Sequence, residues 1–135
     1  MSLSVQDALI HLMVTTASSD AALSDQELKR MDALIGRLPI FEGFDRSRLP
    51  AVANACIDGI NGATGLEGAL DNAVAAVPKR LQDTAYALAV EVAVVDLQLP
   101  QEELRLLEMI RDRLDIDRLI TAAIEAAARA RMRTA

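Results

Sequence analysis

The stretch Ser24-Asp-Gln-Glu-Leu-Lys-Arg-Met-Asp-Ala-Leu-Ile-Gly-Arg-Leu38 decides the fold class of this chain. Ser24 is followed three residues later by Glu27, the spacing of a capping box, in which the two residues bond each other's backbone N–H groups at a helix start. Apolar side chains then recur at helical spacing, at Leu28, Met31, Leu34, Ile35 and Leu38. The stretch therefore predicts a helix that begins at Ser24 and buries one face.

The composition extends this interpretation to the whole chain. Of its 135 residues, 52% are hydrophobic and only 2% aromatic, so a core must be built from aliphatic side chains and alanine. Six Gly and four Pro are too few for a β-sandwich, which needs a turn roughly every 8–12 residues. We predict a single all-α domain over residues 1–135, a bundle of about seven helices with two related helical hairpins.

Start and stop signals place the helices along the chain. Predicted starts lie near Ser4, Ser24, Ser47, Thr64, Pro78, Pro100 and Asp115. Ser47 is expected to cap the third helix, and Thr64 with Glu67 has capping-box spacing before the fourth. The fifth helix is expected to continue through the valine-rich segment up to Val95 rather than give way to a strand. In the sixth helix the inward residues are expected to be Leu104, Leu107 and Ile110.

The charge is acidic and unevenly distributed. The 14 basic and 20 acidic residues give a formal net charge of −6, which argues against nucleic-acid binding, because that needs a basic surface. The last nine residues instead carry Arg129, Arg131 and Arg133 and no acid. These arginines suit a helix C-terminus. They are expected to support self-association or binding to an anionic partner, with a frayed helix end as the alternative.

Other features bear on the compartment. The single Cys56 allows no intrachain disulfide and suits a reducing environment. The first residues lack the basic-then-apolar order of a signal peptide. The most apolar stretch, Ala85–Val95, is interrupted by Glu91 and is shorter than the roughly 20 residues needed to span a bilayer. The expectation is a soluble, cytoplasmic protein without direct membrane insertion.

An internal repeat relates two segments of the chain. The segment from Asp20 to Lys29 aligns with the segment from Asp96 to Arg105 at a constant offset of 76 residues. The identical pairs are Asp20/Asp96, Leu23/Leu99, Glu27/Glu103 and Leu28/Leu104, followed by Arg37/Arg113 and Leu38/Leu114. Leucine matches are expected between any two amphipathic helices, but the paired Asp and Glu at one fixed spacing are not.

The repeat brings a candidate metal site. If both turns lie at the same end of the bundle, the carboxylates of Asp20, Glu27, Asp96 and Glu103 converge. Clustered carboxylates are the ligands that hard cations such as Ca²⁺, Mg²⁺ or Mn²⁺ prefer. The alternative is helix capping, because acids are favoured at helix N-termini and Glu27 is already explained as the capping partner of Ser24. Both interpretations stay open at the level of the sequence.

These paired Asp-to-Glu turns in a seven-helix chain resemble the tellurite-resistance TerB family over nearly the whole chain. The resemblance implies an all-helical, two-hairpin domain whose acidic residues chelate metal, with the acidic pairs at Asp20 and Glu27 and at Asp96 and Glu103. It also implies a role in bacterial responses to tellurite and other chemical stress, with protein partners that include a membrane-associated stress complex. The family pattern usually has Gly after the Asp, where this chain has Ala21 and Leu97.

Other single residues have ordinary structural interpretations. His11 is the only histidine and is expected at the surface or the edge of the core, and Cys56 is expected to be buried as a small hydrophobe. Phe41 and Phe44 are expected to pack their loop onto the bundle. Glu91 marks either a solvent-exposed face or a buried, paired carboxylate.

Two functions follow as hypotheses. The first is a non-enzymatic stress-response protein of the TerB type with an acidic site for a divalent cation. The second is an acidic helical protein-interaction module without a metal site, whose acidic face docks a basic partner. Self-association into a homo-oligomer is compatible with both. An enzyme is disfavoured, because the sequence has no phosphate-binding Gly loop, no nucleophile elbow and only one histidine.

Overall fold

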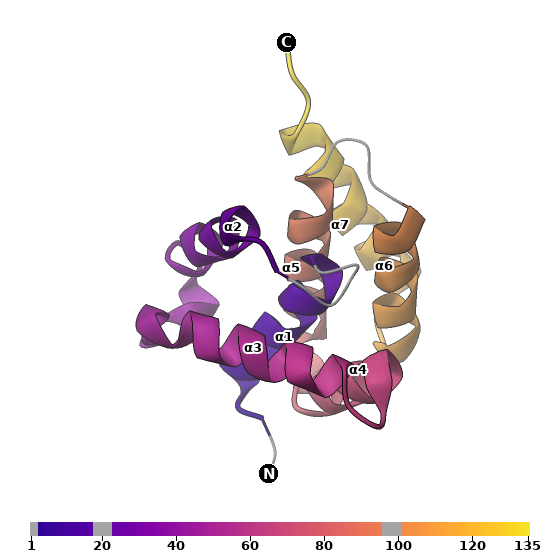
Figure 1. Ribbon diagram of the computed structural model, residues 1–135. Helices are drawn as coiled ribbons and strands as arrows, with labels where there is room; N and C mark the ends of the chain where they lie inside the picture. The colour runs from indigo at the N-terminus through magenta and orange to yellow at the C-terminus, as the bar shows by residue number, and fades with distance from the viewer. Residues whose placement is uncertain (1–2, 18–22, 96–100) are drawn as a thin grey trace.

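The computed structural model describes residues 3–17, 23–95 and 101–135, apart from the side chains of residues 101–103. These residues form an all-α bundle (Figure 1), and no strand occurs among them. The helices are α1 (Val5–Ala17), α2 (Asp25–Ile35), α3 (Leu49–Ile60), α4 (Gly65–Ala75), α5 (Gln82–Val94), α6 (Gln101–Arg113) and α7 (Arg118–Arg131). The predicted fold class is confirmed, and so is the helical state of the valine-rich segment, which belongs to α5.

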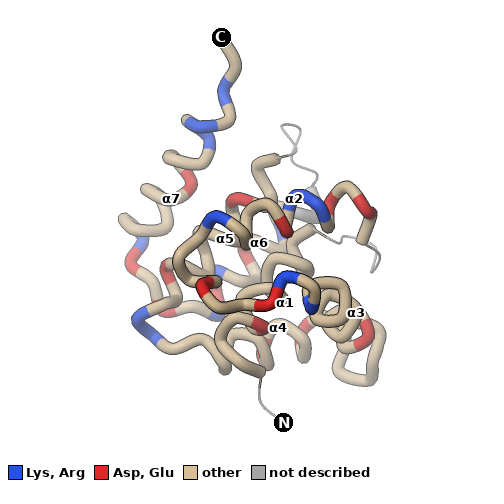
Figure 2. Tube along the Cα trace, turned by 90° about the vertical axis from the view of Figure 1, so that its left-hand side faces the viewer, with Lys and Arg blue, Asp and Glu red and all other residues tan. Residues whose placement is uncertain are grey.

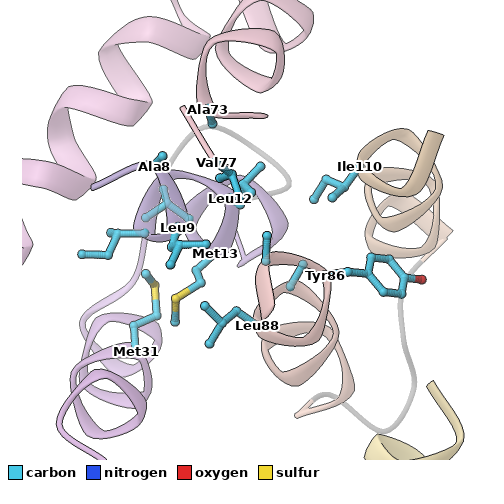
Figure 3. Close-up of a cluster of buried hydrophobic side chains, with 14 of the residues drawn as sticks. Ala8, Leu9, Leu12, Met13, Met31, Ala73, Val77, Tyr86, Leu88 and Ile110 are labelled. Atoms are coloured by element: carbon cyan, nitrogen blue, oxygen red, sulfur yellow. The ribbon is translucent and has the colours of Figure 1, made fainter. Parts of the chain in front are cut away.

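Helix α1 is the centre of the bundle. Ten consecutive residues, from Ala8 to Ala17, are buried, so the helix is covered on every side rather than along one stripe. It packs against α3, α4, α5 and α6. Figure 3 shows Leu9, Leu12 and Met13 of α1 within a cluster of apolar side chains from the surrounding helices. A helix without Lys or Arg can take this position, because it carries no long charged side chain that must reach water.

Helices α5, α6 and α7 form one side of the molecule. Helix α5 packs against α1, α6 and α7, and its residues Ala85, Ala89 and Ala93 are fully buried. Alanine at these positions lets neighbouring helix backbones approach closely. Helix α7 packs against α5 and extends to the upper end of the molecule in Figure 1, where the chain ends.

Helix α2 stands to one side of the bundle (Figure 1). Its buried residues are Met31 and Ile35, and Figure 3 shows Met31 pointing from α2 toward Met13 of α1. Its other apolar residues, Leu28 and Leu34, are only partly buried. The segment that decides the fold class therefore forms the predicted helix, but it buries a narrower face than the pattern of five apolar residues indicates.

Two of the predicted helix caps are wrong. Ser47 caps no helix: the Asp45 side chain accepts a hydrogen bond from the Ser47 N–H and starts a short 3-10 helix, Arg46–Arg48, and α3 follows at Leu49. Thr64 precedes α4 but makes no capping hydrogen bond, because its backbone is already helical (φ −88°, ψ −10°) and not extended as a capping residue requires.

The predicted inward face of α6 is also partly wrong. Leu104 is 41% exposed, whereas Leu106 is 6% exposed and Ile110 is fully buried. Leu107 and Leu114 are buried as well. The face that meets α1, α4 and α5 therefore contains Leu106, Leu107, Ile110 and Leu114 and does not contain Leu104.

The structure agrees with the expectations for Phe41, Phe44, Cys56 and His11. Phe41 and Phe44 both lie in the core, with ring centroids 6.1 Å apart in an edge-to-face arrangement. Cys56 is buried, and His11 is buried at 9% exposure. Within the described ranges, no helix combines the length and apolarity needed to cross a bilayer.

Candidate functional site

The four predicted metal ligands are only partly covered by the structure. Asp20 and Asp96 lie outside the described residues. Glu103 belongs to α6, but its side chain also lies outside them. Glu27 is in the first turn of α2. The convergence of the four carboxylates therefore stays a prediction.

Glu27 has a structural role that the sequence predicts. Its carboxylate accepts a hydrogen bond from the Ser24 N–H at 3.0 Å, and the Ser24 hydroxyl accepts one from the Glu27 N–H at 3.1 Å. These two bonds complete a capping box and satisfy backbone groups that the helix leaves unpaired. Among the residues described, no three His, Cys, Asp or Glu side chains lie close enough together to hold a metal ion.

A hollow of the described part of the molecule lies between α2 and α5. It encloses about 690 Å³ and is lined on the α5 side by Glu91, Val92 and Val95. A second hollow of similar volume, about 690 Å³, continues along the same two helices. Both are lined by Leu34, Arg37 and Glu91, so they form one continuous groove, called the α2–α5 groove below.

Helical spacing explains why these side chains share the groove. On α2 the lining residues include Glu27, Arg30 and Leu34, which recur every three or four residues and lie on one helix face, and Arg37 follows just after the helix end. On α5 they are Thr84, Ala87, Leu88, Glu91, Val92 and Val95, again one face. The first hollow runs along α2 from Ser24 to Arg37 and meets the end of α5, and the second joins the end of α2 to the earlier part of α5, from Thr84 to Glu91. The two helices therefore line the groove in opposite directions over about 15 Å, since ten residues of helix rise about 1.5 Å each.

The wall of the groove is apolar with charged side chains along it. Its apolar residues are Ala17, Met31, Ala33, Leu34, Val92 and Val95 in the first hollow, and Leu38, Pro39, Ile40, Ala87 and Leu88 in the second. Glu91 forms an ion pair with Arg131 of α7, which also lines the groove. This pair gives the glutamate the partner that a half-buried carboxylate requires.

Two arginines of the groove are left without such a partner in the described part of the chain. Arg30 and Arg37 are both exposed, and no described carboxylate forms an ion pair with either. The two carboxylates of the groove are already engaged, Glu27 by the backbone of Ser24 and Glu91 by Arg131. The described lining of the groove carries Arg30, Arg37 and Arg131 against Glu27 and Glu91, a net charge of +1, although the chain as a whole is acidic.

The position of α2 beside the groove is held by Arg46. Its guanidinium donates two hydrogen bonds to the carboxylate of Asp32, at 3.0 and 2.8 Å. These bonds hold the pKa of Asp32 below its usual value. Gly36 lets the guanidinium lie against the end of α2, because a Cβ atom there would come within 2.7 Å of it.

A smaller hollow of about 370 Å³ is lined by His11 and Cys56. The Cys56 thiol donates to the backbone carbonyl of His11 at 3.5 Å and lies 3.6 Å from the Thr15 hydroxyl. Burial raises the pKa of the Cys56 thiol and lowers the pKa of the His11 imidazole, which the charge of Asp7 partly offsets. Both groups are therefore uncharged near pH 7, and a neutral buried thiol is a poor nucleophile.

A polar cluster that the sequence does not reveal joins α5, α6 and α7. The Tyr86 hydroxyl donates to the Glu125 carboxylate, which also accepts from Arg111 at 3.2 Å. Burial and the bond to Glu125 raise the pKa of Tyr86. The three residues come from separate helices and show no common spacing, so no sequence signal could have found them.

The groove too was missed by sequence reasoning, although one signal was available. Apart from Glu91, the stretch Ala85–Val95 is apolar on every side of the helix, and such a helix has more apolar surface than one neighbour can cover. Comparison with protein-family models, curated proteins and solved structures gives no significant match to this chain.

Proposed function

We propose that this chain is a non-enzymatic protein-interaction module that holds an acidic amphipathic helix of a partner protein in the α2–α5 groove. The observation that carries the proposal is the groove itself, an apolar channel between two helices with arginines along its edge. An amphipathic helix binds such a channel with apolar side chains spaced three, four and seven residues apart.

The dimensions of the groove support a short helical ligand. A groove about 15 Å long accommodates about three turns of helix, or roughly ten residues. The two hollows have apolar walls at both ends, so they can take anchors that are one or two turns apart. A partner of this kind explains why α2 stands apart from α5.

The charges of the groove support an acidic ligand. Arg30 and Arg37 can pair with carboxylates placed beside the apolar anchors of the partner helix. The net charge of the chain suggested a basic partner instead, but the acidic side chains of the described residues are spread over several helices (Figure 2). The groove arginines favour the acidic partner within the α2–α5 groove.

The stress-response function implied by the TerB resemblance remains a separate proposal. It rests on the repeat of Asp20 and Glu27 at Asp96 and Glu103. It includes an acidic site for a divalent cation, Ca²⁺, Mg²⁺ or Mn²⁺, at the two turns, and its membrane-associated partners are part of the same proposal. Glu27 is one of the predicted ligands and also lines the groove, so the cation and the peptide are tested in separate titrations.

The proposal is tested with two synthetic helical peptides of about 14 residues, each about four turns long. Both carry leucines on one face at the spacing of the groove, and they differ only in flanking glutamates or flanking lysines. We expect the glutamate peptide to bind more tightly in a fluorescence anisotropy titration, because its carboxylates can pair with the groove arginines.

Two protein variants locate the binding. Arg30→Glu places a negative charge in the groove and is expected to weaken the glutamate peptide at least about tenfold, roughly 1.4 kcal/mol. Lys29→Glu makes the same charge change on the neighbouring residue, which is exposed on α2 but does not line the groove. It is expected to leave the affinity within about twofold. Equal loss in the two variants, or tighter binding of the lysine peptide, would overturn the proposal.

A further inference from the structure

Helices α3 and α4 pack against each other and against α1, in front of which they lie in Figure 1. The hollow of about 370 Å³ that contains His11 and Cys56 opens between these helices and is called the α3–α4 hollow below. Its sides are small residues of the two helices, Ala55 and Gly59 on α3 and Ala69, Asn72 and Ala75 on α4. Within each helix these residues recur every three or four positions, so they lie on one face.

The small size of these residues leaves the hollow open to solvent. Ala55, Gly59 and Ala75 are exposed, and a Cβ atom added at Gly59 would have no atom within 4 Å beyond its own helix. The volume of the hollow lies within the range of small-molecule sites, roughly 300–1,000 Å³. Small residues alone do not indicate a ligand, and the evidence for one is the polar group at the floor of the hollow.

His11 is this polar group. It is 9% exposed, whereas every other residue of α1 from Ala8 to Thr16 is at most 2% exposed, so α1 reaches solvent at the hollow. Outside the helix backbone, the described hydrogen bonds of His11 use only its carbonyl oxygen, which accepts from Thr15 and Cys56. The imidazole therefore has no partner among the described residues, although buried polar groups normally have one.

The imidazole offers a hydrogen bond to the hollow in an uncharged form. Within the described ranges, Asp7 Oδ1 is the one fully enclosed side-chain oxygen or nitrogen without a partner, so the unpaired His11 nitrogens are open to the hollow. Burial lowers the pKa of His11, and the charge of Asp7 only partly offsets this effect. A neutral imidazole has one N–H donor and one acceptor nitrogen, and a hydroxyl group can pair with either. The described residues that line the hollow include no Asp, Glu, Lys or Arg, so none of them would compensate a charged ligand.

We propose that the α3–α4 hollow binds a small uncharged molecule of about the size of phenol, with one hydroxyl group bonded to the His11 imidazole. The apolar body of the molecule then lies between the small residues of α3 and α4. The Cys56 thiol is engaged by the His11 carbonyl and forms part of the floor. A millimolar dissociation constant is expected, because the ligand is small and the hollow is open on one side.

The test uses phenol itself as the probe, followed by NMR of the full chain. His11 is the only histidine, so its imidazole signals are identified without ambiguity. Millimolar phenol is expected to shift these signals and the methyl signals of Ala55 and Ala75. The methyl signal of Ala51, at an exposed position of α3 outside the hollow, is expected to stay unchanged. Absence of the His11 and alanine shifts overturns the proposal.

A variant that fills the hollow locates the binding. Gly59→Leu places a side chain in the open space and is expected to weaken phenol binding at least about tenfold. The change is compatible with folding, because glycine is the weaker helix former. Ala51→Leu adds a leucine to the same helix outside the hollow and is the matched control, with an affinity expected within about twofold of the parent chain. Equal affinities in the two variants overturn the proposal.

Toluene, which is similar in size but has no hydroxyl group, isolates the hydrogen bond to His11. The ratio of phenol affinity to toluene affinity is compared between the parent chain and His11→Phe, so that the different hydration of the two molecules cancels. Loss of the imidazole leaves the phenol hydroxyl unpaired, and the ratio is expected to fall at least about fivefold. An unchanged ratio overturns the proposal, and Gly59→Leu, which leaves the core untouched, tests the site independently of the His11 variant. None of these outcomes depends on the α2–α5 groove.

Discussion

Glu91 of α5 forms an ion pair with Arg131 near the end of α7, and both side chains line the α2–α5 groove. The glutamate is the one charge in the most apolar stretch of the chain. Its side chain is 28% exposed and that of Arg131 is 55% exposed, so the pair lies at the boundary between groove and solvent. The ion pair therefore links the end of α7 to α5, and the positive charge of Arg131 balances the negative charge of Glu91 in the groove.

The strength of this pair follows from its exposure. Glu91→Gln and Arg131→Gln are each expected to destabilise the fold, and a double-mutant cycle in urea is expected to give a coupling energy of about 0.2–1 kcal/mol. A half-exposed pair is screened by water, so a coupling of several kcal/mol would contradict the geometry. Glu67→Gln, which removes an exposed carboxylate from α4, is the control and is expected to be close to neutral.

The only histidine makes stability depend on pH near neutrality. Burial lowers the pKa of His11 in the folded chain below its ordinary value of 6.5, so the unfolded chain binds the proton more tightly. The free energy of unfolding is therefore expected to fall as the pH drops below 6.5 toward the folded pKa. Urea titrations between about pH 5.5 and 7.5 measure this slope.

A variant without the imidazole isolates this effect. His11→Gln removes the titrating group and is expected to flatten the pH dependence in that window, even if it lowers stability at every pH. An NMR titration of the parent chain should place the His11 pKa below 6.5. A pKa above that ordinary value, or an unchanged slope in the variant, would contradict the burial argument.

The start of α2 depends on the capping box. Ser24→Ala removes the hydroxyl that accepts the Glu27 N–H and is expected to cost about 1 kcal/mol in the free energy of unfolding. Ser47→Ala is the matched comparison, because Ser47 is also exposed but its hydroxyl donates only to Asp45 and caps no helix. Its cost is expected to be about 0.5 kcal/mol or less. Equal costs would mean that Ser24 does not act as a cap.

The predicted cation site is tested by thermal denaturation. If Asp20, Glu27, Asp96 and Glu103 converge, a divalent ion relieves their mutual repulsion and stabilises the folded state by about 2.7 kcal/mol at a hundredfold excess over Kd. Millimolar Ca²⁺, Mg²⁺ or Mn²⁺ is then expected to raise the Tm more than monovalent salt of equal ionic strength.

Substitutions distinguish shared ligands from capping groups. Asp20→Asn and Asp96→Asn are each expected to reduce the divalent shift, and their combination to be non-additive if both bind one ion. In the absence of metal the same changes should be neutral or mildly stabilising. Loss of stability without metal, together with no divalent shift in the parent chain, would assign both residues to turn and capping roles.

The sequence predicts local features better than relationships between helices. The Ser24–Glu27 capping box, the helical valine-rich segment and the buried Cys56 depend on neighbours within one helix or on side-chain polarity. The groove depends on where α2 stands relative to α5. That position is set by Met31 in the core and by Asp32 bonding Arg46, 14 residues further along the chain.

The failures have the same origin. Leu104 has the helical spacing of an inward residue, but which side of α6 faces the core is decided by α1, α4 and α5 and not by α6 alone. Tyr86 and Glu125 are 39 residues apart, and nothing near either one predicts their bond. The Thr64 cap fails because its backbone conformation, set by the turn before it, is helical.

The central claim is that the α2–α5 groove holds an acidic amphipathic helix, and amide chemical shifts of the ¹⁵N-labelled chain test it most directly. Titration with the glutamate-flanked peptide is predicted to shift the amides of Leu34, Val92 and Val95, which line the groove, and to leave that of Asp71 on α4 unchanged. Shifts confined to α7 or α3, or no shifts at peptide concentrations near a millimolar, would contradict the claim.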